Sequence, residues 1–209
     1  MKLKFCGFRQ LADVKKAKDL DIDAMGFIHF PKSKRFVDIQ TIKQFTDIIP
    51  EDKEKVVILV NPEYKVIDSL IEETGITSIQ LHGEEPLSTI SYIRQKNKDI
   101  KIIKALPAKD SASLLTAIEY YKYVIDQFII DTPSQNYGGT GKVYDWKMLE
   151  VIRDIDYLIA GGINYENIQK IAQLSLQHSG YDIASCIETN NVKDKCKMQS
   201  IIELVKGAN

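Results

Sequence analysis

The segment Lys2-Leu3-Lys4-Phe5-Cys6-Gly7 reads as a short β-strand that ends in a thiol and leads through a glycine into a helical pattern. A cysteine at a strand end is poorly placed for packing alone. It is well placed for chemistry in a fold of repeated βα units, because such folds gather their active sites at the carboxyl ends of the strands.

Short β-branched runs alternate with amphipathic helical patterns along the rest of the chain. In the last helical pattern, for example, the apolar residues are Met198, Ile201, Ile202 and Val205. The runs predict eight strands, at Leu3–Cys6, Ala24–Ile28, Lys55–Val60, Ser78–Leu81, Lys101–Lys104, Gln127–Ile130, Tyr157–Ala160 and Tyr181–Ala184.

Helix-start signals agree with this pattern. Asp38, Asp145 and Asn164 are predicted to cap the second, sixth and seventh helices, and Pro86 is expected in the first turn of the fourth. Eight βα units in 209 residues predict an α/β fold, a single (βα)8 TIM barrel with one domain over residues 1–209. The alternative is an open doubly wound sheet, which usually has fewer strands.

Composition limits the possible partners. The net charge of −1 gives no indication of binding to nucleic acid or to an anionic membrane. No apolar run reaches the roughly 18 residues that span a bilayer, and the N-terminal residues do not resemble a signal peptide. Three cysteines without a C-x-x-C pair fit free thiols in a cytoplasmic protein.

Four reactive side chains follow predicted strands: Cys6 after the first, Arg35 after the second, His82 after the fourth and Asp131 after the sixth. Each alone has an ordinary structural interpretation, as a buried thiol, a solvated charge, a structural imidazole or a turn residue. A barrel would bring all four to one mouth, and this favours a functional interpretation.

Glycine-rich segments follow the sixth and seventh strands. Gly138-Gly139-Thr140-Gly141-Lys142 lacks P-loop spacing, and Val143 stands where Ser or Thr would be needed, so we do not predict nucleoside triphosphate binding. We interpret the segment as a lid, with Gly139 and Gly141 as substrate-binding candidates.

The ends of the seventh and eighth strands predict a phosphate site. Gly161 and Gly162 would let the backbone approach an anion closely, and Ser185 and Cys186 end the eighth strand. No metal-ligand cluster or dinucleotide fingerprint is evident, so we expect neither a metal nor a cofactor. The natural inference is a cofactor-free isomerisation of a phosphosugar, with Cys6 as base and Asp131 as acid.

Ordered motifs along nearly the whole chain resemble the phosphoribosylanthranilate isomerase family of tryptophan biosynthesis. They are Lys4-Phe5-Cys6-Gly7, Asp23-Ala24-Met25-Gly26-Phe27, Pro31-Lys32-Ser33-Lys34-Arg35, Gln80-Leu81-His82-Gly83, Ile130-Asp131-Thr132, Gly138-Gly139-Thr140-Gly141-Lys142 with Asp145-Trp146, and Ala160-Gly161-Gly162.

The resemblance implies a (βα)8 barrel that catalyses the Amadori rearrangement of N-(5-phosphoribosyl)anthranilate to 1-(2-carboxyphenylamino)-1-deoxyribulose 5-phosphate. It implies that Cys6 removes the C2 proton, that Asp131 protonates the ring oxygen, that Arg35 binds the anthranilate carboxylate and that His82 lines the pocket. We expect this phosphorylated small molecule as the partner, with no nucleic acid and no membrane, and a monomer or homodimer.

The chain departs from the family pattern at three places. The family usually has a small hydroxyl residue at Arg9, reads Ser-Ser-Gly-Val-Glu where this chain has Ala184-Ser185-Cys186-Ile187-Glu188, and has a glycine at Asn191. These departures bear on phosphate affinity and leave open a phosphosugar-binding barrel that has lost catalysis. A second alternative, the histidine-pathway aminoaldose isomerase, resembles a two-aspartate design, whereas the first strand here ends in Cys6.

Overall fold

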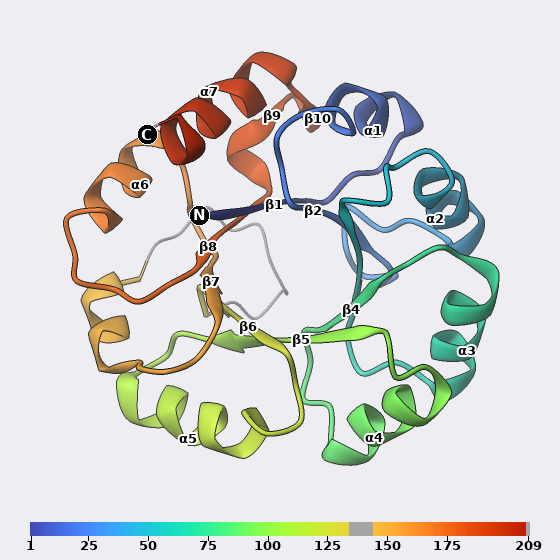
Figure 1. Cartoon of the computed structure of the whole chain (residues 1–209), viewed down its shortest axis with the longest axis horizontal. Coiled ribbons are helices and arrows are strands. Elements are labelled where there is room, and N and C mark those ends of the chain that lie inside the picture. The colour runs from blue at the N-terminus through green and yellow to red at the C-terminus, as the bar shows by residue number, and fades with distance from the viewer. Residues whose placement is uncertain (134–143, 208–209) are drawn as a thin grey trace.

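The computed structural model describes residues 1–133 and 144–207. Parallel strands β1 to β8 pair in chain order and close into a barrel, as predicted. Figure 1 shows the helices arranged as a ring around it, with the last helix, α7, beside α6 and α1. The barrel strands are β1 (Lys2–Cys6), β2 (Ala24–Ile28), β3 (Glu54–Leu59), β4 (Ser78–Leu81), β5 (Lys101–Pro107), β6 (Gln127–Asp131), β7 (Tyr157–Ile159) and β8 (Gly180–Ile183).

The outer ring consists of α-helices and one 3-10 helix. They are α1 (Leu11–Ala17), α2 (Ile39–Thr46), α3 (Tyr64–Glu73), α4 (Leu87–Lys96), α5 (Ser111–Tyr121), the 3-10 helix η1 (Trp146–Val151), α6 (Tyr165–Ile171) and α7 (Lys195–Lys206). A second 3-10 turn, η2 (Ser185–Ile187), and the two-residue strands β9 (Glu188–Thr189) and β10 (Val192–Lys193) lie between β8 and α7.

Strand limits differ from the predicted ones by a few residues at most. The largest difference is at β5, which continues to Pro107 because Leu106 and Pro107 pair with Ile130 and Asp131 of β6. Asp38, Asp145 and Asn164 cap their helices as predicted, although the helix after Asp145 is a 3-10 helix. The expectation for Pro86 is wrong by one position, because it is the N-cap of α4.

Alternation along the strands divides the core into two layers. Most apolar side chains that point outward pack between the sheet and the helices. The side chains that point inward form a smaller cluster, Cys6, Ala24, Val56, Ile58, Ile103, Ala105, Ile129, Leu158 and Ala160. Cys6 belongs to this inner cluster, and Asp131 shares the inward direction of Ile129, two residues before it. Both therefore face the interior at the carboxyl end of the barrel.

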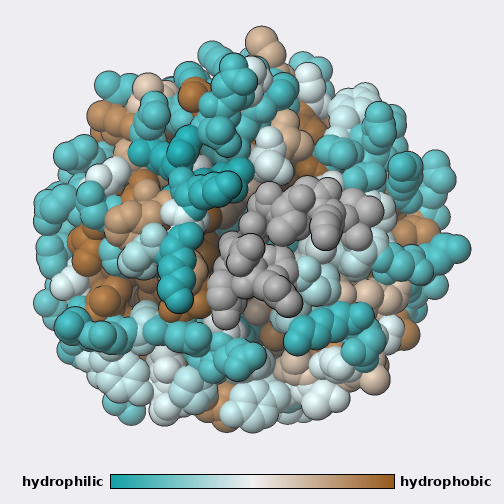
Figure 2. All heavy atoms as spheres, turned by 180° about the vertical axis from the view of Figure 1, so that it is seen from behind, coloured by the Kyte–Doolittle hydropathy of each residue, from teal (hydrophilic) through white to brown (hydrophobic). Residues whose placement is uncertain are grey.

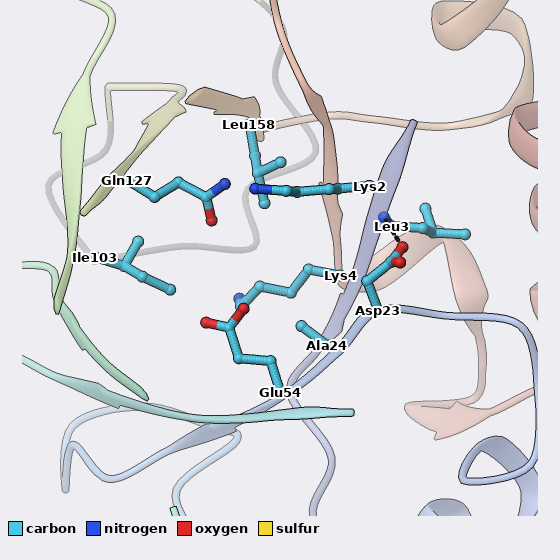
Figure 3. A pocket seen from close by; sticks show the side chains of 9 residues that line it. All are labelled: Lys2, Leu3, Lys4, Asp23, Ala24, Glu54, Ile103, Gln127 and Leu158. Carbon is cyan, nitrogen blue, oxygen red and sulfur yellow. Dashed lines mark hydrogen bonds between the residues drawn. The ribbon is translucent and has the colours of Figure 1, made fainter. Parts of the chain in front are cut away.

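The opposite end of the barrel holds polar side chains from the strand starts. A pocket there is lined by Lys2, Leu3, Lys4, Asp23, Ala24, Glu54, Ile103, Gln127 and Leu158 (Figure 3). Ion pairs join its rim: Lys2 Nζ lies 2.7 Å from Asp156 Oδ2, and Lys101 Nζ lies 3.0 Å from Glu54 Oε2. In barrel enzymes this face contributes stability, and the chemistry lies at the other face.

The hairpin of β9 and β10 was not predicted from the sequence. Asn190 and Asn191 form its two-residue turn with φ of 53° and 61°. Asparagine tolerates this left-handed conformation better than most residues do. Asn191 can therefore adopt it at the position where the resembled family usually has a glycine.

The face turned toward the viewer in Figure 2 carries mostly hydrophilic side chains, with apolar ones in small patches between them. Among the helices of the described residues, none combines the length and apolar character that crossing a membrane requires.

Candidate active site

Cys6 is the last residue of β1 and is 7% exposed. The glycine opposite it on β2 makes room for its sulfur, because a Cβ at Gly26 would lie 2.8 Å from Sγ. Burial raises the pKa of the Cys6 thiol, and the neighbouring cations Lys4 and Lys193 oppose that rise. The thiol is thus held in a dry position with positive charge beside it.

Asp131 ends β6, and His82 directly follows β4. Nε2 of His82 lies 3.6 Å from Oδ2 of Asp131, while Oδ1 accepts a 2.7 Å hydrogen bond from the backbone N–H of Thr132. Burial raises the pKa of Asp131 to about 6 and lowers that of His82 to about 4. At neutral pH the imidazole is therefore uncharged, and the carboxyl can hold a proton far more readily than an exposed aspartate.

Arg35 lies in the loop between β2 and α2 and reaches back over the end of β1. Its Nε donates to Oε1 of Glu188 at 3.0 Å and its Nη2 to Oε2 at 2.7 Å. Gly7, with φ of +81°, makes this approach possible, because a Cβ there would lie 2.5 Å from Cδ of Arg35. The guanidinium is thereby fixed beside the Cys6 strand end.

Lys193 of β10 links this cluster to two barrel strands. Its buried ammonium donates to the carbonyls of Cys6 at 2.6 Å and Ala184 at 3.0 Å, and to Oε1 of Glu188 at 2.7 Å. Three donors meet three acceptors, which satisfies the buried charge. The hairpin is therefore attached to the ends of β1 and β8.

The predicted phosphate residues lie at the ends of β7 and β8. Gly161 and Gly162 have φ of +81° and +64°, and a Cβ at Gly161 would lie 2.7 Å from Oδ1 of Asp131. Ser185 is exposed in η2, and Cys186 is partly buried against the core with no positive φ.

Gly139 and Gly141 lie outside the described residues. The remaining candidates follow the strands of one barrel, and the barrel brings Cys6, His82, Arg35 and Asp131 to its carboxyl end. Their binding and catalytic roles stay predictions.

Sequence reasoning missed two residues of this end of the barrel and two more in the interior beneath it. Glu188 and Lys193 hold Arg35 and the Cys6 carbonyl, and Lys4 and Asp182 form a buried ion pair of 2.8 Å in the barrel interior. Lys4 could have been found from its sequence, because it stands two residues before Cys6 on the same strand and must share its inward direction. The pairing of Glu188 depends on the hairpin, which the sequence did not reveal.

Within residues 1–133 and 144–207, no three His, Cys, Asp or Glu side chains are grouped so that they could hold a metal ion. The chain is thus a (βα)8-barrel protein with a thiol, a carboxyl, an imidazole and a guanidinium at the carboxyl end of the barrel.

Comparison with known proteins identifies the family. The family model for N-(5'-phosphoribosyl)anthranilate isomerase matches residues 3–204. The chain is 51% identical to the N-(5'-phosphoribosyl)anthranilate isomerase of Staphylococcus aureus over 207 residues, which covers 99% of this chain and 98% of that protein. The chain belongs to the phosphoribosylanthranilate isomerase family, as the sequence motifs predicted.

Solved structures of phosphoribosyl anthranilate isomerases have a similar fold. Phosphoribosyl anthranilate isomerase from Thermotoga maritima has a TM-score of 0.84 and 27% identity, with 99% of each chain covered. A phosphoribosyl anthranilate isomerase in complex with reduced 1-(o-carboxyphenylamino)-1-deoxyribulose 5-phosphate shares the fold, with a TM-score of 0.81, 24% identity and 99% of each chain covered.

Proposed function

We propose that this chain is an active isomerase of tryptophan biosynthesis that converts N-(5-phosphoribosyl)anthranilate to 1-(2-carboxyphenylamino)-1-deoxyribulose 5-phosphate by acid–base catalysis. Family membership supports the reaction class. The assignment of acid and base is supported by the different environments of Cys6 and Asp131 at the carboxyl end of the barrel. Cys6 is a buried thiol with cations beside it, and Asp131 is a carboxyl whose pKa is raised to about 6.

The first step suits Asp131. Its protonated carboxyl gives a proton to the furanose ring oxygen, the bond from that oxygen to C1 breaks, and the nitrogen lone pair forms a protonated imine at C1. A carboxyl with a pKa near neutrality is a more effective acid at physiological pH than one near 4. The neutral imidazole of His82, beside Asp131, lines the pocket without adding a competing positive charge.

The second step suits Cys6. Its thiolate takes the C2 proton, and the electron pair of the C–H bond forms the C1–C2 double bond while the imine nitrogen becomes an amine. The resulting enol gains a proton at C1 and loses its hydroxyl proton, leaving a ketone at C2. Atoms and electrons balance within the substrate, so this scheme requires no cofactor.

Binding requires recognition of two anionic groups. Arg35 is proposed to bind the anthranilate carboxylate, because its planar guanidinium matches a carboxylate and stands beside Cys6. The phosphate is proposed to bind at the ends of β7 and β8, where Gly161, Gly162, Ser185 and Cys186 lie. Gly161 and Gly162 support this, because without side chains their backbone can come close to an anion.

The proposal places the protein in the cytoplasm, as a monomer or a homodimer. Turnover of freshly made N-(5-phosphoribosyl)anthranilate by the purified protein tests the function. Formation of the ketose product supports it. Binding of substrate or product without turnover would favour the alternative, a phosphosugar-binding barrel without catalysis.

A further inference from the structure

The ion pair between Lys4 and Asp182 lies inside the barrel, beneath the proposed acid and base. Lys4 Nζ is 2.8 Å from Asp182 Oδ1, and the two side chains are 1% and 9% exposed. Their strands are neighbours, with Lys4 paired to Asp182 in the β1–β8 register. Figure 3 shows the Lys4 side chain extending from β1 into the barrel interior.

The direction of Lys4 follows from strand alternation. Lys4 and Cys6 are two residues apart on β1, so both side chains point inward and lie about 6–7 Å apart at their Cα atoms. The Lys4 ammonium and the Cys6 thiol also interact electrostatically, and each shifts the pKa of the other toward its charged form. The buried cation is thus paired with a carboxylate and lies on the same side of β1 as the thiol.

A buried ion pair usually adds little to stability, because removing two charges from water costs about as much as their attraction returns. The interior of this barrel could be filled by apolar side chains, as it is at Val56, Ile103 and Ile129. The pair therefore suggests a task other than stability.

We propose that Lys4 is a positioning residue for the reaction: its ammonium, oriented by Asp182, stabilises the thiolate of Cys6 and so keeps the base in the form that accepts a proton. Asp182 prevents the ammonium from becoming an unpaired buried charge. This inference rests on the proposed function only for the identity of the base.

The charged groups around Cys6 agree with this assignment. Lys4 on β1 and Lys193 on β10 lower the pKa of the thiol, and Asp182 on β8 raises it, with the effect of Lys4 larger than that of Asp182. Arg35 also interacts with Cys6 from the β2–α2 loop. Lys193 already donates to two carbonyls and to Glu188, whereas Lys4 points inward from the strand of Cys6, two residues before it.

The test measures the ionisation of Cys6 in the protein without substrate. Thiolate absorbance in the far ultraviolet is followed against pH for each variant and for its Cys6→Ser counterpart, and the difference isolates Cys6. Lys4→Met removes the cation but leaves Asp182 unpaired. The double variant Lys4→Met/Asp182→Asn removes both charges and is expected to fold even if the single variant does not.

In Lys4→Met we expect the Cys6 midpoint to rise by at least about one pH unit, so that the thiolate population below the midpoint falls at least about tenfold. In the double variant the midpoint should rise by less, because the opposing charge of Asp182 is removed as well. Lys4→Arg, which keeps the cation, should stay closer to the wild-type midpoint. In turnover, Lys4→Met or the double variant should lower kcat more than it changes KM, and higher pH should restore part of the loss.

A buried lysine of the same kind provides the control. Lys104 on β5 lies 2.9 Å from Glu85 with both side chains almost fully buried, but it is on the outer side of the sheet, over the ring of Tyr121. Lys104→Met, or Lys104→Met/Glu85→Gln if the single variant does not fold, should reduce stability and leave the Cys6 midpoint in place.

An unchanged midpoint in folded Lys4→Met/Asp182→Asn would overturn the inference. Retained turnover in Cys6→Ala would instead overturn the proposed role of Cys6, and the midpoint measurement would still decide whether Lys4 stabilises the thiolate.

Discussion

Glu188 accepts two hydrogen bonds from Arg35, at 3.0 Å from Nε and 2.7 Å from Nη2, and it also accepts one from Lys193 at 2.7 Å. The two cations keep the pKa of the Glu188 carboxyl low despite its burial. Arg35 is therefore charged and oriented before a ligand arrives, and little side-chain entropy remains to be lost when it binds a carboxylate.

Replacing Arg35 with lysine should weaken substrate binding. An ammonium cannot form the paired contacts of a guanidinium, and a charge-assisted contact is worth roughly 1.5–3 kcal/mol. We expect KM to rise about ten- to a hundredfold with a smaller change in kcat. Arg94→Lys is the matched control, because Arg94 pairs with Asp126 before the start of β6, away from the mouth. Equal KM in Arg35→Lys and wild type would place Arg35 outside the binding site.

Gly161 controls the position of Asp131. A Cβ at Gly161 would lie 2.7 Å from Oδ1 of Asp131 and 2.6 Å from the backbone nitrogen of Thr132, and φ there is +81°. Gly161→Ala should therefore cost about 1–3 kcal/mol in the free energy of unfolding and reduce kcat by displacing Asp131, the proposed acid. Gly75→Ala, whose nearest contact would be an ordinary 3.4 Å to Thr46, should change neither. Wild-type kcat in Gly161→Ala would show that the position of Asp131 does not depend on this glycine.

His178 should make stability depend on pH. Its ring lies between Tyr157 and Tyr181, at 6.4 and 5.0 Å between ring centroids, and burial lowers its pKa to about 4. The folded state then holds fewer protons than the unfolded state between pH 4 and 6.5, so the contribution of His178 to stability falls as the pH drops through this range.

Urea unfolding at pH 7 and pH 5 measures this effect. The wild type should lose about 1–2 kcal/mol more between the two pH values than His178→Phe does. His82 contributes in the same direction and Asp131 in the opposite one, so only the difference between the two proteins isolates His178. An identical pH dependence in both proteins would contradict the prediction.

The pH profile of kcat/KM should decline on two sides, with one decline near the pKa of the proposed acid and one near the pKa of the proposed base. In the proposed mechanism the active form needs a protonated Asp131 together with a Cys6 thiolate. The pKa of Asp131, about 6, lies below the raised pKa of Cys6. The population of that form is then constant between the two pKa values and falls on either side. Asp131→Asn should lose the decline near pH 6 and show a decline only below the pKa of Cys6. A wild-type profile without a limb near 6 would argue against Asp131 as the acid.

The sequence predicted the barrel because β-branched runs, helical periodicity and the caps at Asp38 and Asn164 all agree with the same alternating pattern. It also predicted Cys6 and Asp131 at one mouth, since strand ends of a parallel barrel share one face. The Lys4–Asp182 pair was missed because the alternation of side chains along a strand shows only that Lys4 points inward. It does not show which distant side chain Lys4 contacts. The contact of Glu188 with Arg35 was missed because it depends on the hairpin that turns at Asn190 and Asn191. That turn has no glycine, which is the residue that usually marks a two-residue hairpin turn in a sequence.

The proposed roles of Cys6 as base and Asp131 as acid are tested by the steady-state kcat of Cys6→Ala and Asp131→Asn on freshly made N-(5-phosphoribosyl)anthranilate. Loss of a general acid or base should lower kcat at least about 10²-fold while KM stays near the wild-type value. Cys196→Ala, at an exposed thiol on α7, is the control and should keep wild-type turnover. Near-wild-type kcat in Cys6→Ala or in Asp131→Asn would show that the residue concerned is not the base or the acid of this reaction.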